Sequence, residues 1–153
     1  MRFLRWTLLC VALTAPLAVQ AQREKLPPED LQIVEKNWPD AKKTSTGLRS
    51  VVVKEGAGDL VKSGNLVSVI YKGQLLDGTV FDETKDPAKP FEFRVGRGQV
   101  IDGWEQGLQL MRLGEKRIII VPFELGYGTR GDPPKIPKRA TLVFEVEVVA
   151  IKK

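Results

Sequence analysis

Hydrophobic residues in this chain lie in short runs separated by glycine- and proline-rich turns, and in two of these runs they alternate with polar residues. Residues 91–95 alternate between apolar and polar side chains, as a half-buried strand does. In residues 141–151, four apolar side chains share one face, and Glu145 and Glu147 point to the other. Short runs rich in valine and isoleucine predict further strands over residues 48–54, 66–71 and 117–121.

A hairpin and one helix complete the expected elements. Asp77-Gly78 lies between apolar residues and indicates a tight turn between two strands. The helix is expected to begin at Asp102, which would cap it together with Glu105 three residues later, and to end near Gly114. Trp104 begins its apolar face. The chain is therefore expected to form an α+β fold, an antiparallel sheet of five or six strands with one short helix packed against its apolar face.

The first segment, residues 1–21, has the pattern of a cleavable signal peptide. Two early arginines precede an apolar run that Pro16 interrupts, and the run ends in Val19-Gln20-Ala21, which suits cleavage after Ala21. The run is too short to span a bilayer comfortably, which disfavours the alternative of an uncleaved anchor. A lipoprotein is disfavoured because Cys10 follows Leu9 rather than a small residue.

The rest of the chain divides into an arm and a domain. Residues 22–46 are expected to form a short polar and helical arm, with a helix that starts near Pro27 and stops before Pro39. Residues 47–153 are expected to form the folded domain. The arm is too short to be a second domain.

Composition excludes several classes of enzyme. The sequence contains no histidine, and its one cysteine, Cys10, lies in the predicted signal peptide. Catalytic triads, most zinc sites and a disulfide framework are therefore excluded from the mature chain, and no cofactor or metal is expected. The net charge of the whole sequence is +5, and two of the positive charges are arginines of the predicted signal peptide. The basic stretch of residues 135–139 is interrupted by proline and isoleucine. We therefore expect no nucleic-acid partner.

Seven motifs, in order and at family spacing, resemble the FKBP-type peptidyl-prolyl cis/trans isomerases over roughly residues 46–152. They are residues 69–73 (VIYKG), 77–82 (DGTVFD), 90–93 (PFEF), 100–107 (VIDGWEQG), 126–128 (GYG), 136–137 (IP) and 140–146 (ATLVFEV). The resemblance implies a twisted antiparallel sheet wrapped around a short helix, which agrees with the fold expected from the hydrophobic pattern.

The resemblance also implies an apolar pocket for a substrate proline. It implies catalytic roles for Tyr71, Phe81, Asp82, Trp104 and Tyr127. It implies substrate contacts from Phe91, Val100, Ile101, Ile136 and Phe144. Trp104 would be the floor, the Tyr127 hydroxyl and the backbone N–H of Ile101 would donate hydrogen bonds to substrate carbonyls, and the Tyr71 hydroxyl would hold Asp82.

The implied activity is rotation of X-Pro bonds during the folding of exported proteins, without a covalent intermediate. The implied partners are proline-containing polypeptides and macrolide immunosuppressants. We expect an exported monomer, periplasmic or secreted, with no membrane association after signal cleavage. Pro87, Asp132 and Lys135 depart from residues common in the family at the pocket edge, and are expected to change substrate preference more than activity.

Other interpretations remain open at this point. The same pocket could bind proline-containing segments without turnover mattering, so that the protein would be a binding module. A general holdase is disfavoured because the loop of residues 125–137 is too short for a chaperone insert. The aromatic residues could also be ordinary core; Tyr127 is the hardest to interpret in that way, because flanking glycines let a loop turn its side chain inward.

Overall fold

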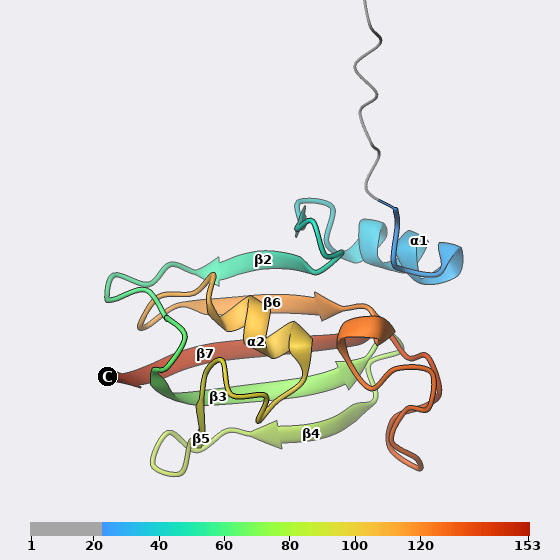
Figure 1. Ribbon diagram of the computed structural model, residues 1–153. Helices are drawn as coiled ribbons and strands as arrows, with labels where there is room; N and C mark the ends of the chain where they lie inside the picture. Colours follow the sequence, from blue (N-terminus) through green and yellow to red (C-terminus); the bar gives the residue numbers. More distant parts are fainter. Residues whose placement is uncertain (1–22) are drawn as a thin grey trace, which may run out of the picture.

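The computed structural model describes residues 23–153, so the predicted signal peptide lies outside the described residues (Figure 1). These residues form a seven-stranded antiparallel sheet in the order β1-β2-β6-β7-β3-β4, with β5 also paired to β3. The strands are β1 (Lys42–Lys43), β2 (Arg49–Lys54), β3 (Leu66–Leu75), β4 (Val80–Thr84), β5 (Phe91–Arg94), β6 (Lys116–Val121) and β7 (Leu142–Lys152). The predicted fold class is confirmed. The sheet has more strands than expected because β1, with only two lysines, carries no periodic pattern.

Three helical segments accompany the sheet within residues 23–153. They are α1 (Pro28–Asn37), α2 (Asp102–Leu108) and the 3-10 turn η1 (Phe123–Leu125). None of the helices in residues 23–153 has the length and apolar character needed to cross a membrane.

The predicted start and end of α2 were partly wrong. Its N-cap residue is Ile101, without a side-chain capping bond, and the helix ends at Leu108 rather than near Gly114. Glu105 does not close a capping box with Asp102, because its carboxylate instead accepts the backbone N–H groups of Gly96 and Gly98. That carboxylate therefore fastens the loop before the helix.

Helix α2 packs on one face of the sheet, which we call the inner face (Figure 1). Two glycines allow this close approach. A Cβ atom on Gly103 would lie 2.5 Å from Cγ1 of Val121, and one on Gly107 would lie 2.7 Å from Cδ1 of Ile119. The alternation predicted for β7 is confirmed, since Leu142, Phe144, Val146 and Val148 are buried on this face.

The opposite, outer face of the sheet has a second, smaller core. Leu26 and Val34 of the arm are buried there with Ile120 of β6 and Val143 of β7. Figure 1 shows α1 at the same end of the sheet as the loop that follows β6. The predicted helix is thus present, and it is packed against the domain rather than extended away from it.

Candidate active site

A cavity of about 200 Å³ opens beside α2 on the inner face. It is lined by Tyr71, Phe81, Asp82, Phe91, Gln99, Val100, Ile101, Trp104, Tyr127 and Phe144. Every site residue implied by the sequence resemblance lines it except Ile136, which is buried in the main core. Gln99 was not expected, because a polar residue in a loop gives no periodic or motif signal.

Trp104 forms the floor of the cavity and is 3% exposed. Its ring meets Tyr71 edge-on with centroids 4.9 Å apart, and Phe144 edge-on at 5.4 Å. Phe93 lies beside it at 5.8 Å. Edge-to-face contacts of this kind are each worth about 0.5–1.5 kcal/mol beyond burial, so together they fix the orientation of the indole.

A glycine in β3 makes room for the far wall. Gly73 pairs with Asp82 of β4 on one side and with Phe144 of β7 on the other. A Cβ atom at Gly73 would lie 2.8 Å from both the Phe81 and Phe144 rings, whose centroids are 5.6 Å apart. The missing side chain therefore lets these two aromatic rings meet across the strand.

The carboxylate of Asp82 is oriented by a tyrosine. The Tyr71 hydroxyl donates a hydrogen bond to Oδ2 of Asp82 at 2.6 Å, as the sequence resemblance implied. Tyr71 lies opposite Thr84, and Asp82 precedes Thr84 by two residues, so Asp82 is the diagonal neighbour of Tyr71 on the same face of the strand pair. Burial, and then the Asp82 carboxylate, raises the pKa of Tyr71 well above its ordinary value.

Tyr127 stands at the mouth, with 39% of its surface exposed. The loop around it is closed by hydrogen bonds from Gly128 N to Phe123 O at 2.8 Å and from Gly131 N to Tyr127 O at 3.1 Å. Burial, followed by the charges of Asp132 and Asp82, raises the pKa of the Tyr127 phenol. The phenol therefore stays a protonated donor throughout the neutral range.

The loop of Val100 and Ile101 is held from below by Glu105. Its Oε2 accepts Gly96 N at 2.5 Å and its Oε1 accepts Gly98 N at 2.9 Å. Gln99 Oε1 accepts Arg94 N at 2.8 Å, which fixes the next residue of the same loop. This arrangement presents Val100 and Ile101 to the cavity in a defined position.

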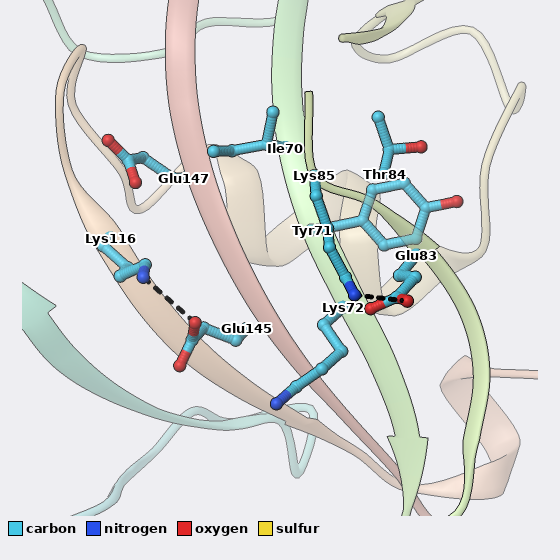
Figure 2. Close-up of a pocket in the computed structure, with 9 residues that line it drawn as sticks. All are labelled: Ile70, Tyr71, Lys72, Glu83, Thr84, Lys85, Lys116, Glu145 and Glu147. Carbon is cyan, nitrogen blue, oxygen red and sulfur yellow. Dashed lines mark ion pairs between the residues drawn. The ribbon is translucent and has the colours of Figure 1, made fainter. Parts of the chain in front are cut away.

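A second hollow, of about 260 Å³, lies over β3, β4, β6 and β7 and is mostly charged (Figure 2). Lys116 pairs there with Glu145 at 3.0 Å and Lys85 with Glu83 at 2.8 Å. These two ion pairs lie at a solvated surface, where such pairs contribute little. Although it is larger, it lacks the aromatic floor of the cavity over Trp104, which is the better candidate for binding an apolar ring.

The fold and the cavity define a small sheet-and-helix domain with one aromatic pocket. Residues 58–149 match the family described as FKBP-type peptidyl-prolyl cis-trans isomerase. The chain therefore belongs to the FKBP-type peptidyl-prolyl cis-trans isomerase family.

Individual relatives agree with this assignment. The peptidyl-prolyl cis-trans isomerase FKBP2 of Mus musculus is 53% identical over 92 residues, which are 60% of this chain and 66% of the relative. The FK506-binding protein 1 of Dictyostelium discoideum is 42% identical over 106 residues, covering 69% of this chain and 99% of the relative. A peptidyl-prolyl cis-trans isomerase of Pseudomonas syringae pv. tomato has a similar structure, with a TM-score of 0.73, 32% identity, and coverage of 84% of this chain and 94% of that one. The match to the mouse relative thus spans slightly less than two thirds of that protein.

The two tyrosines provide a direct test of the site. Because they are the only tyrosines in the sequence, the rise in absorbance at 295 nm that accompanies phenol ionisation reports on these two residues. Both pKa values are raised, so we expect each phenol to be less than half ionised in the folded protein near pH 10, where an ordinary tyrosine is half ionised. The Tyr127→Phe variant isolates Tyr71, the more strongly shifted of the two.

The same shifts set the sign of the effect on stability. A folded-state pKa above the unfolded value contributes stability that is complete below about pH 10 and is lost as the pH rises through the folded pKa. Urea denaturation should therefore show a falling free energy of unfolding above about pH 10. Titration of both phenols in the folded protein with an ordinary midpoint would contradict this description of the cavity.

Proposed function

We propose that this protein catalyses cis/trans rotation of X-Pro peptide bonds in exported polypeptides. The proposal rests mainly on the cavity over Trp104, which has hydrogen-bond donors at its edge. Neither histidine nor cysteine lines this cavity, so it offers no thiol nucleophile and no imidazole base to activate one. The name of the family to which the chain belongs points to the same reaction.

The reaction needs no bond to be broken. Rotation about an X-Pro bond only has to overcome amide resonance, with a barrier of about 18–20 kcal/mol. Water stabilises the planar, charge-separated amide, so transfer into an apolar cavity weakens that resonance. A millionfold acceleration requires about 8 kcal/mol, which desolvation, a shape fitted to the twisted form and one or two donors supply together.

Each part of the cavity has a role in this proposal. The proline ring rests on the Trp104 indole, against the walls formed by Phe81, Val100 and Phe144, with Phe91 at the rim. The Tyr127 hydroxyl and the backbone N–H of Ile101 donate to substrate carbonyls, and Asp82, held by Tyr71, lies beside the rotating amide. The edge residues Pro87, Asp132 and Lys135 influence which residues are accepted next to proline.

The partners follow from the same cavity. Proline-containing segments of unfolded polypeptides are the proposed substrates. Macrolides of the FK506 type are proposed ligands, since the Dictyostelium relative is named an FK506-binding protein. We propose that the chain acts as a monomer after export to the periplasm or the extracellular space.

The kinetic test is the isomerisation rate of a short Leu-Pro peptide. Tyr127→Phe removes one donor and should lower kcat/KM about tenfold, the equivalent of one hydrogen bond of about 1.4 kcal/mol. Trp104→Leu should lower it further. Because no group with a pKa near neutrality takes part in the reaction, kcat/KM should be nearly independent of pH from about pH 6 to 8.

The control is Leu110→Ala, which changes an exposed apolar side chain outside the cavity and should leave the rate unchanged. Binding of the peptide without catalysis would support the binding-module alternative. A steep pH profile with a midpoint near neutrality would exclude the proposed mechanism.

Export is tested by cleavage of the leader. In a bacterial expression host, the mature protein should begin at Gln22, as measured by intact mass. Ala21→Leu should block cleavage and accumulate the precursor, because signal peptidase requires a small residue before the cut. Gln20→Leu is the matched control and should be cleaved normally. Recovery of the uncleaved wild-type chain from the same host would contradict the signal peptide.

A further inference from the structure

The part of the arm before β1, residues 23–41, is tied to the outer face by polar bonds as well as by its apolar residues. The Glu24 carboxylate accepts the backbone N–H of Leu26 and pairs with Arg49 at 2.8 Å. Burial opposes the ionisation of Glu24, but these partners and the Lys43 ammonium outweigh it and lower its pKa to about 2. The start of the arm is thus fixed to β1 and β2.

Two further bonds join the arm to the segment that carries Tyr127. We call residues 125–140 the Tyr127 loop. Just before the loop, Glu124 forms an ion pair with Lys25 at 2.5 Å. Just after it, the Thr141 hydroxyl donates to Oδ2 of Asp30 at 2.6 Å. The arm therefore contacts the chain at both ends of the Tyr127 loop.

The two bonds differ in strength. The Lys25–Glu124 pair is 35% and 44% exposed, and exposed ion pairs contribute little. Thr141 is only 3% exposed. Removal of the Asp30 carboxylate would therefore leave a buried hydroxyl without a hydrogen-bond partner, which is costly. The Asp30–Thr141 hydrogen bond is therefore the main fastening.

Short contacts connect this fastening to Tyr127. Two residues before Thr141, Arg139 N donates to Gly128 O at 3.2 Å, and the Arg139 guanidinium lies 4.9 Å from the centre of the Phe123 ring. Phe123 O in turn accepts the N–H of Gly128, the neighbour of Tyr127. A shift of Thr141 would therefore displace the backbone that holds the Tyr127 phenol at the cavity mouth.

We propose that the arm is a clamp that positions Tyr127, with Asp30 as a positioning residue that acts through Thr141. The catalytic consequence of the clamp rests on the proposed isomerase function, whereas its effect on the order of the Tyr127 loop does not. The arm lies before the region that matches the family, residues 58–149, whereas Thr141 lies within it.

The test compares variants at the two ends of the hydrogen bond in the mature protein. Thr141→Val removes the donor at nearly constant shape, and Asp30→Ala removes the acceptor. Each should lower kcat for the Leu-Pro peptide about three- to tenfold with little change in KM, because a misplaced donor is lost mainly in the transition state. Amide exchange should accelerate at Gly128 and Gly131, whose N–H groups donate to Phe123 O and Tyr127 O.

Three further variants separate positioning from general stability. Asp30→Asn keeps an acceptor and should retain most of the activity. The double variant Asp30→Ala/Thr141→Val should be no worse than either single change, because both remove one bond. Ser68→Ala is the matched control: Ser68 is also a 3% exposed hydroxyl that donates to a carboxylate, Glu92, at 2.7 Å, but it lies in β3. It should lower the Tm without lowering kcat or loosening the Tyr127 loop.

The outcomes distinguish the two proposals. Faster exchange at Gly128 and Gly131 in Thr141→Val and Asp30→Ala, but not in Ser68→Ala, supports the clamp. Unchanged exchange there, or an equal loss of kcat in Ser68→Ala at equal loss of Tm, overturns it. If the wild-type protein shows no isomerase activity, the proposed function fails, and the exchange measurement still decides whether the arm orders the loop.

Discussion

The short distance between α2 and the inner face of the sheet determines the position of Trp104 and therefore the shape of the cavity. Gly103 and Gly107 have no side chain to hold the helix away from Val121 and Ile119. The helix therefore sits low enough for the Trp104 indole to reach Tyr71 and Phe144 edge-on. Larger residues at the two glycine positions would overpack this contact, at a cost of about 1–3 kcal/mol, and would lift the floor of the cavity.

The cavity combines an apolar interior with a polar rim. Its floor and walls are aromatic and aliphatic, whereas Asp82 and Tyr127 stand at the edge. Burial keeps both phenols protonated, so that they act as donors and not as bases. Such a site suits a reaction in which the solvation of an amide changes and no covalent bond is made.

Much of the fold could be predicted because each long element carries a local pattern. Strand β7 alternates along its length, and Asp77-Gly78 marks the turn between β3 and β4. The capping box was wrong because a carboxylate three residues into a helix can bond either to its own helix end or to a nearby loop. In this chain Glu105 bonds to Gly96 and Gly98, a choice that depends on tertiary structure.

The site was harder to derive from local patterns than the fold. Periodicity alone does not separate Trp104 from an ordinary core tryptophan, and only the order of the motifs indicated a cavity. Ile136 was expected to contact the substrate, but it does not line the cavity and is 3% exposed in the core beneath the inner face. The docking of the arm could not be predicted either, because Asp30 and Thr141 are 111 positions apart and neither belongs to a pattern that links them.

The most direct test of the central claim, that the cavity over Trp104 is where proline bonds rotate, is exchange NMR on a Leu-Pro peptide with a catalytic amount of the mature protein. The indole N–H signal of Trp104 is followed in the same sample. We expect cis/trans exchange peaks that appear only with protein present, together with a shift of the Trp104 signal as the peptide saturates the site. Accelerated exchange with an unmoved Trp104 signal, or a moved signal without exchange, would show that proline bonds do not rotate in this cavity.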